Sequence, residues 1–136
     1  MNLACSEPEL EQLLNTVPFT RMFGFVLRDI ADGQASIDVP FRADFERPGG
    51  VVCGPVLMAA ADVAMWLAIK TKLGLADSSM TAEMKTSFLG GAKTEGFRCT
   101  AKVLKLGRRL IYGVAECVDS TGRLLTHHTL TYMRGE

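Results

Sequence analysis

One segment of the chain, GPVLMAAADVAMWLAI at residues 54–69, restricts the possible folds more than any other. Apart from Asp62 it is apolar all the way round, so a helix formed here has no polar face to turn towards water. The apolar run is about 14 residues long and carries a carboxylate, whereas a membrane-spanning helix needs roughly 20 apolar residues. The segment is therefore predicted to be a buried helix from about Gly54 to Lys72, ended by Gly74.

Alternating patterns on both sides of this helix predict β-strands. A strand around residues 23–30 and the alternating segment QASIDVP flank an Asp32-Gly33 turn, which is typical of a hairpin. A loop rich in arginine, proline and glycine is expected at residues 41–52. After the helix, four segments with short connections are typical of strands: TAEMKTSFL, FRCTAKVLKL, LIYGVAECV and LLTHHTLTYM. These four predict an antiparallel meander.

The order of these elements predicts an α+β fold in which an antiparallel sheet wraps around one long central helix. The chain has 136 residues, and we expect a single domain over residues 1–136. A capping box in SEPELEQLLN adds a short N-terminal helix at about residues 6–15. One sheet covers only one side of an apolar helix, so a second copy of the chain is expected to cover the rest and form a homodimer.

Charge and cysteine patterns exclude several classes of function. Lys+Arg and Asp+Glu both number 15, and this balance argues against nucleic acid as the main partner. The N-terminus lacks the basic start and apolar run of a signal peptide, no segment is long enough to cross a membrane, and no Cys-x-x-Cys pair occurs, which together favour the cytoplasm. His127 and His128 would point to opposite faces of one strand and cannot chelate one metal together. We expect no metal and no redox cofactor.

Asp62 has two interpretations. An ionised carboxylate taken out of water costs several kcal/mol even after relaxation, so a buried Asp62 would need an arginine or hydrogen-bond donors beside it. Alternatively, Asp62 faces a cleft at a subunit interface and acts as a general base or orients a water molecule. Its neighbours Met65 and Trp66 are predicted to belong to the core rather than to a substrate pocket.

The segment RPGGVVCGPV leads into the helix and favours the second interpretation. Gly50 and Gly54 let the backbone approach a ligand closely. The unpaired N–H groups at a helix N-terminus can stabilise a developing oxyanion, and Pro55 suits the first helical turn. Asp62 lies about 12 Å further along the same helix at a rise of about 1.5 Å per residue. One copy cannot easily bring both groups to one carbonyl, whereas two copies packed helix to helix could.

Over residues 20–134 the chain resembles hotdog-fold acyl-CoA thioesterases of the phenylacetic-acid-degradation (PaaI-like) type. The features that carry this resemblance are the order of the elements, the glycine-rich start of an apolar helix, Asp62 in the middle of that helix, and the later LGRRL. The family commonly has His-Gly-Gly at the helix start with an acidic residue nine positions after the histidine. Here Cys53 stands in place of that histidine, Pro55 in place of the second glycine, and the nine-residue spacing to Asp62 holds. An asparagine common six positions before the histidine is Arg47 here. The resemblance implies a hotdog fold, homodimers that pair into dimers of dimers, and sites at the dimer interface.

The resemblance also implies roles for individual residues. The N–H of Gly54 would bind the thioester carbonyl, and Asp62 of the other subunit would activate water or attack the carbonyl directly. Thr81, at the start of the third strand, would help to place the water. Arg108 and Arg109 resemble the family's Gly-Arg turn near the phosphates of coenzyme A, although a solvated surface is the alternative.

Two residues near the start of the helix each have two possible roles. Cys53 lies where the pKa of a thiol tends to fall and could be a nucleophile, but no histidine base stands near it in the sequence, and a small packing residue is the alternative. Arg47 could bind a carboxylate or phosphate of the substrate bidentately, or could pair with Asp44 or Glu46.

The function expected from these features is hydrolysis of a small or medium acyl-CoA, aromatic acyl groups included, to the free acid and coenzyme A, which enters only as part of the substrate. A non-catalytic protein that binds acyl-CoA or another acyl ligand is the first alternative, and the missing family histidine and asparagine favour it. An enoyl-CoA hydratase is the second. Such hydratases pair an aspartate with a histidine a few residues later, and no histidine follows Asp62.

Overall fold

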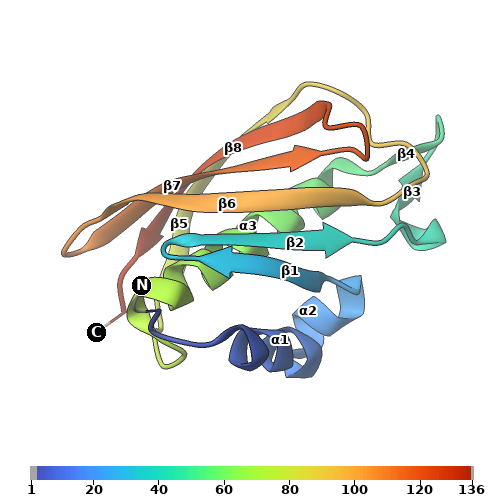
Figure 1. Ribbon diagram of the computed structural model, residues 1–136. Coiled ribbons are helices and arrows are strands. Elements are labelled where there is room, and N and C mark those ends of the chain that lie inside the picture. Colours follow the sequence, from blue (N-terminus) through green and yellow to red (C-terminus); the bar gives the residue numbers. More distant parts are fainter. Residues whose placement is uncertain (1–2, 136) are drawn as a thin grey trace.

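A single antiparallel sheet curved around one long helix makes up most of the molecule (Figure 1). The computed structural model describes residues 3–135. The central helix, α3, spans Gly54–Leu73, with Pro55 in its first turn and Gly74, at a φ of 93°, as its C-cap. The six strands of the sheet are β1 (Val26–Ala31), β2 (Gln34–Val39), β5 (Met80–Phe88), β6 (Phe97–Leu106), β7 (Leu110–Val118) and β8 (Leu124–Met133). This arrangement confirms the predicted α+β hotdog architecture.

The strand order is β1-β2-β6-β7-β8-β5, and every neighbouring pair is antiparallel. The predicted meander of the last four strands is therefore correct for β6, β7 and β8 and wrong for β5. Strand β5 pairs with β8 instead of β6, so the connection after β5 crosses over to the middle of the sheet. Strand β5 thus forms one edge, and its outer side has no strand partner among residues 3–135.

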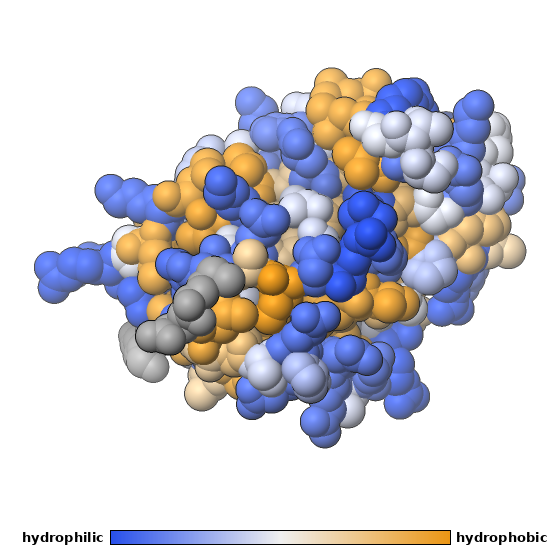
Figure 2. Space-filling model, viewed as in Figure 1, coloured by the Kyte–Doolittle hydropathy of each residue, from blue (hydrophilic) through white to orange (hydrophobic). Residues whose placement is uncertain are grey.

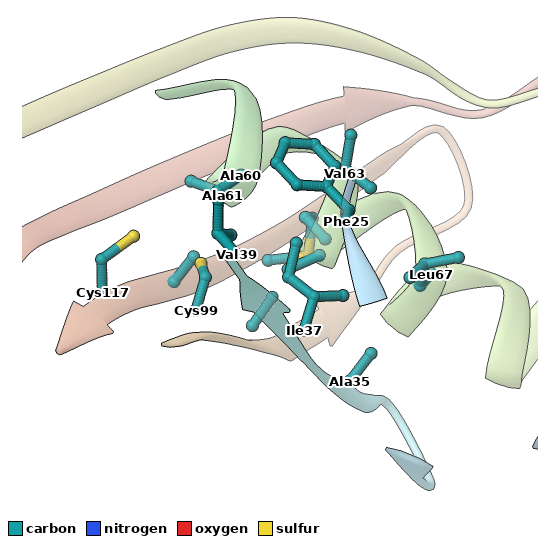
Figure 3. Close-up of a cluster of buried hydrophobic side chains, with 14 of the residues drawn as sticks. Phe25, Ala35, Ile37, Val39, Ala60, Ala61, Val63, Leu67, Cys99 and Cys117 are labelled. Atoms are coloured by element: carbon teal, nitrogen blue, oxygen red, sulfur yellow. The ribbon is translucent and has the colours of Figure 1, made fainter. Parts of the chain in front are cut away.

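The core lies between the concave face of the sheet and α3 (Figure 3). Strand β2 contributes Ala35, Ile37 and Val39, which alternate with more polar residues as the sequence pattern predicts. On α3, the buried residues include Ala60, Ala64 and Leu67. The small alanines let the helix approach the sheet closely, which explains why this helix can be surrounded by a sheet of short radius.

The N-terminal part of the chain differs from its prediction. Helix α1 spans Glu7–Thr16 and begins at a capping box formed by Ser6 and Glu9. A second helix, α2 (Pro18–Phe23), was not predicted, and it ends at Phe23, where the strand was expected to begin. Proline fits the first turn of a helix, and Gly24 ends it at a φ of 72°, so the strand begins only at Val26.

The predicted loop at residues 41–52 contains a short 3₁₀ helix, η1 (Ala43–Phe45), and a two-stranded ribbon of β3 (Glu46–Arg47) and β4 (Val51–Val52). Gly49 and Gly50 turn the ribbon at φ values of 106° and 73°, which favour glycine. The ribbon leads directly into α3, so it fixes the direction from which the helix begins.

The surface of the face viewed in Figure 1 mixes hydrophilic and hydrophobic areas (Figure 2). Large apolar side chains that are exposed on the single chain include Met80 and Phe88 of β5, Tyr112 of β7 and Met133 of β8. Within residues 3–135, no helix is long and apolar enough to cross a membrane.

Candidate active site

Asp62 is partly buried and is held by hydroxyl groups from two strands. The Thr81 hydroxyl of β5 donates a hydrogen bond of 2.6 Å to its Oδ1. The Tyr132 hydroxyl of β8 lies 2.7 Å from the same Oδ1 and 2.8 Å from the Asp62 backbone oxygen. No arginine or lysine forms an ion pair with Asp62 in the part of the chain that the structure describes. The carboxylate is therefore stabilised by neutral donors and keeps its negative charge unpaired.

Thr81 reaches Asp62 because of a β-bulge. Strict alternation in TAEMKTSFL places Thr81 on the face opposite Met84, and that expectation is wrong. The register of β5 against β8 shifts between Thr81 and Glu83, so Thr81 pairs with Tyr132 while Glu83 pairs with Thr131. The extra residue turns Thr81 to the side of the sheet that faces α3, as bulges commonly re-aim a side chain near a functional site.

Tyr132 was not among the residues expected at the site. It is 3% exposed, and burial together with the nearby charge of Asp62 raises the pKa of its hydroxyl well above the ordinary value. The hydroxyl therefore remains protonated and donates to the carboxylate. Alternation in LLTHHTLTYM assigns Tyr132 to the same face as His128, but its contact with Asp62 depends on the strand order, which the sequence pattern does not specify.

A cavity of about 330 Å³ opens beside Asp62. Its walls combine this carboxylate and the two hydroxyls with apolar and aromatic side chains, among them Phe19 of α2, Val63 and Trp66 of α3, and Met80 of β5. The prediction that Met65 belongs to the core is confirmed, since it is 1% exposed. Trp66 is partly buried and packs against the core, and it also lines the cavity. An aromatic wall beside a carboxylate suits an apolar substrate group with a reactive polar centre.

Trp66 is held in place by Lys70, one helical turn further along α3. The ammonium group of Lys70 lies 5.1 Å from the centre of the Trp66 ring and donates to the backbone oxygens of Leu75 and Asp77 at 3.0 and 3.1 Å. Burial lowers the pKa of Lys70. Lys70 thereby connects the cavity wall to the segment that leads from α3 into β5.

Gly54 lines a different cavity, of about 510 Å³, at the α3 N-terminus. Arg47, Leu57 and Phe88 are among its walls. A Cβ atom added at Gly54 would lie 3.1 Å from the Phe88 ring, so a side chain at this position would crowd the aromatic residue. The first N–H groups of a helix have no partner within the helix, and the N–H of Gly54 is one of them.

The exposed side of α3 connects the two cavities. Gly54, Met58, Asp62 and Trp66 recur at intervals of four residues and are partly or fully exposed along one face of α3, with Pro55 and Ala59 beside them, whereas most other positions between Gly54 and Thr71 are buried. The two cavities share no lining residue. A single chain therefore keeps the helix N-terminus and the carboxylate in separate places along one uncovered stripe.

Comparison with known proteins identifies the family. Residues 49–126, which include the α3 N-terminus and Asp62, match the sequence profile of the thioesterase superfamily. The chain belongs to the thioesterase superfamily. A candidate esterase from Saccharolobus solfataricus is 32% identical over 96 residues, which cover 71% of this chain and 68% of the relative. This membership confirms the expected class of enzyme, a thioester hydrolase.

Solved structures of thioesterase-superfamily proteins superpose on the whole fold. A candidate thioesterase related to phenylacetic acid degradation, from Ralstonia eutropha JMP134, aligns with a TM-score of 0.81 at 26% identity over 90% of this chain and 96% of its own. The PaaI protein from the phenylacetic acid degradation operon of Escherichia coli aligns with a TM-score of 0.86 at 15% identity over 95% of this chain and 92% of its own. These likenesses confirm the resemblance to PaaI-like hotdog proteins.

Cys53 is the N-cap of α3, the position where the resemblance to thioesterases predicts a histidine. The Cys53 side chain makes no capping hydrogen bond and packs against the core, while its N–H donates to the Phe45 oxygen at 2.8 Å. Within residues 3–135 no histidine hydrogen-bonds to Cys53, because His127 pairs with Glu116 and His128 contacts Thr86, Thr126 and Cys117. This environment fits the packing role better than the nucleophilic role.

The arginines expected to bind substrate lie in two separate places. Arg47 lines the Gly54 cavity and forms no ion pair among the described residues, since Asp44 pairs with Arg42 instead. Arg108 and Arg109 form the exposed turn between β6 and β7, at the end of the sheet away from the α3 N-terminus (Figure 1). Gly50 lies in the ribbon turn and is not part of the Gly54 cavity wall.

Residues able to hold a metal are not brought together. His127 projects to the outer face of the sheet and His128 is fully buried, as their alternation predicts. The described part of the chain has no group of three or more histidine, cysteine, aspartate or glutamate side chains placed to hold a metal ion.

Proposed function

We propose that this protein hydrolyses a small or medium acyl-CoA, aromatic acyl groups included, to the free acid and coenzyme A at a site shared by two copies of the chain. The observation that carries the proposal is the position of Gly54 and Asp62 on the uncovered stripe of α3. Met58 lies midway between them in sequence and is 37% exposed. Two copies of the helix packed antiparallel about Met58 would therefore place Gly54 of each copy opposite Asp62 of the other.

Strand β5 supports the same arrangement. It forms a sheet edge with unpaired backbone groups, and exposed edges of this kind are templates for pairing with another chain. Two β5 strands paired antiparallel would extend the sheet across both copies and bring their α3 helices together. The exposed Met80 and Phe88 on β5 would then be covered. Pairing of two such dimers into a dimer of dimers is part of the proposal.

The chemistry follows from the groups that such a pair assembles. The N–H of Gly54 binds the thioester carbonyl oxygen and stabilises the negative charge that develops on it. Along one route, Asp62 of the other copy accepts a proton from water as the water oxygen attacks the carbonyl carbon; the carbon–sulfur bond then breaks, and the departing thiolate of coenzyme A takes the proton from Asp62. Along the other route, the Asp62 carboxylate attacks the carbonyl carbon and the carbon–sulfur bond breaks, which releases the thiolate and leaves a mixed anhydride; water then cleaves the anhydride, restores the Asp62 carboxylate and supplies the proton that the thiolate takes up. No metal or redox step is needed for this reaction.

The remaining parts of the substrate have candidate partners. The aromatic walls beside Asp62 suit the acyl group, and Arg47 beside Gly54 suits a carboxylate or phosphate. In the proposed pair a two-fold axis reverses one helix relative to the other, which would bring Gly54 of the second copy towards the end of the sheet that carries Arg108 and Arg109. These arginines are proposed to contact the phosphates of coenzyme A. A cytoplasmic location is proposed because all four cysteines are free.

A panel of acyl-CoA esters assayed with a thiol reagent tests the proposal, with Asp62→Asn as the decisive variant. The expected result is thiol release by the wild type and a loss of about 10²-fold or more in kcat for Asp62→Asn, because general base catalysis typically contributes about 10²–10⁴-fold. Asp29→Asn is the matched control, because Asp29 is 61% exposed on β1 and away from both cavities. Tight ester binding without thiol release would instead show an acyl-CoA binding protein, and loss of enoyl absorbance without thiol release would show a hydratase.

A further inference from the structure

We propose that Tyr132 is a positioning residue for the reaction: with Thr81 it binds one oxygen of the Asp62 carboxylate, Oδ1, and so presents the other, Oδ2, to the substrate. This inference rests on the proposed function and concerns a residue outside the motif that relates the chain to thioesterases. It assigns different tasks to the two oxygens of one carboxylate.

The two oxygens of the Asp62 carboxylate differ in their hydrogen bonds. Oδ1 accepts from the Thr81 hydroxyl at 2.6 Å and from the Tyr132 hydroxyl at 2.7 Å. Among residues 3–135 no donor reaches Oδ2. Every fully buried side-chain nitrogen or oxygen in partly buried and buried residues has a hydrogen-bond partner, so Oδ2, which lacks one, is accessible from outside. The accessible oxygen is the one that can receive a proton or attack a carbonyl.

The two hydroxyl donors are held in place by the sheet and the core. Tyr132 and Thr81 are direct cross-strand partners in the β5–β8 pair, and the bulge after Thr81 keeps both side chains on the face towards α3. Tyr132 is 3% exposed and its ring is fixed by the surrounding core. Its hydroxyl also lies 2.8 Å from the Asp62 backbone oxygen, so one hydrogen is shared between the main chain and side chain of the same residue. The carboxylate cannot rotate about its Cβ–Cγ bond without breaking both contacts.

A carboxylate restrained in this way is better aligned for the reaction. A carboxylate free to rotate presents either oxygen and spends part of its time misaligned with the attacking water. Holding a catalytic group near its reacting geometry lowers the entropy that must be lost at the transition state. Loss of the restraint should therefore lower kcat while ground-state binding, which uses other contacts, changes little.

The test compares the two tyrosines of the chain by replacing each with phenylalanine. Tyr132→Phe keeps the buried ring and removes the hydroxyl. Tyr112→Phe removes a hydroxyl from an exposed ring on the outer side of β7, 43% exposed, and serves as the control. Hydrolysis of the best acyl-CoA in the panel is measured for each variant, with rates divided by the folded fraction. The expected result is a fall of about 10-fold or more in kcat for Tyr132→Phe with KM within about 2-fold, and wild-type kinetics for Tyr112→Phe.

Crystal structures of the two variants give a second readout that does not depend on turnover. The Asp62 carboxylate is expected to rotate or to show two orientations in Tyr132→Phe, and to keep its bonds to Thr81 and Tyr132 in Tyr112→Phe. If the wild type is active and Tyr132→Phe and Tyr112→Phe have the same kcat, the inference about Tyr132 is wrong while the proposed function stands. An unchanged, single carboxylate orientation in Tyr132→Phe would overturn it as well. A wild type that releases no thiol from any ester would overturn the proposed function, and the catalytic role of Tyr132 with it.

Discussion

Gly54 and Asp62 lie on the same helix, eight residues apart, yet they open into two cavities that share no wall. The helix carries both along the side that its own sheet leaves uncovered. A second copy of this side is the complement that brings a helix N-terminus to a carboxylate. The proposed active site depends on this relationship.

The N–H of Gly54 can be removed with little other change. Gly54→Pro deletes the donor at a helix position where proline is tolerated, whereas Gly54→Ala keeps it. Both variants place a Cβ against the Phe88 ring and both precede Pro55, so they share the same steric strain. We expect Gly54→Pro to lose about 10²–10³-fold in kcat, the usual effect of removing an oxyanion donor, and Gly54→Ala to lose much less. Equal losses in the two variants would show that the N–H has no catalytic role.

Met58 should control dimer formation. If two α3 helices cross near Met58, Met58→Glu places two like charges next to each other in an apolar contact, which is unfavourable. We expect sedimentation to show a dimer dissociation constant raised by at least about 10-fold, or about 1.4 kcal/mol, with thiol release falling in parallel. Met22→Glu is the control: Met22 lies on α2 and is 60% exposed, so this variant should remain dimeric. A dimeric Met58→Glu protein would contradict the proposed packing.

Much of the fold follows from patterns that are local in the sequence. The apolar run from Gly54, the proline in its first turn and Gly74 after it specify α3 because each acts within a few residues. The alternation of β2 predicts its buried face for the same reason. Helix α2 was missed because its signals, Pro18 at the start and Gly24 at the end, lie in a short segment whose aromatic residues also favour strands.

The site depends on information that is not local. Asp62 stands out in the sequence as a charge in an apolar helix, and Gly54 as a glycine at its start. The contact between Asp62 and Thr81 requires a β-bulge, and the contact with Tyr132 requires the strand order that places the end of β8 over α3 at Asp62. Neither the bulge nor the strand order is encoded in a short pattern, because both result from how the sheet closes around α3.

The two adjacent histidines provide a test of the buried polar groups. His128 is fully buried, with its ring nitrogens 2.8 Å from the Thr86 hydroxyl and 2.7 Å from the Thr126 hydroxyl. His128→Leu leaves these hydroxyls without their partner, and we expect denaturant unfolding to show a loss of about 1–3 kcal/mol. His127→Leu removes only an exposed contact with Glu116 and should change stability by less than about 0.5 kcal/mol. Similar losses for both variants would contradict this assignment.

Asp119, in the turn between β7 and β8, should make stability depend on pH. Hydrogen bonds from Thr121, first from its hydroxyl, and from Arg123 lower the pKa of this carboxyl from 3.8 to about 2. Because the pKa is lower in the folded state than in the unfolded state, Asp119 stabilises the fold above pH 3.8, and this contribution is lost as pH falls towards 2.

Comparison with Asp119→Asn isolates that contribution from other acidic groups. The midpoint of thermal unfolding should be higher for the wild type than for Asp119→Asn at neutral pH, and the difference should shrink between pH 4 and pH 2 as the carboxyl is protonated. A difference that stays constant over this range would show that the charge of Asp119 does not stabilise the turn.

The most direct test of the shared site mixes two inactive proteins. Asp62→Asn lacks the carboxylate and Gly54→Pro lacks the N–H donor, so each homodimer has two defective sites. Co-expressed with different affinity tags, the chains also form hybrid dimers, and in each hybrid one site combines an intact Gly54 with an intact Asp62 from the other copy. If the site is shared, purified hybrids should recover about half of the wild-type rate of acyl-CoA hydrolysis, since one of two sites is intact. Hybrids that remain as inactive as the two parent variants would contradict it.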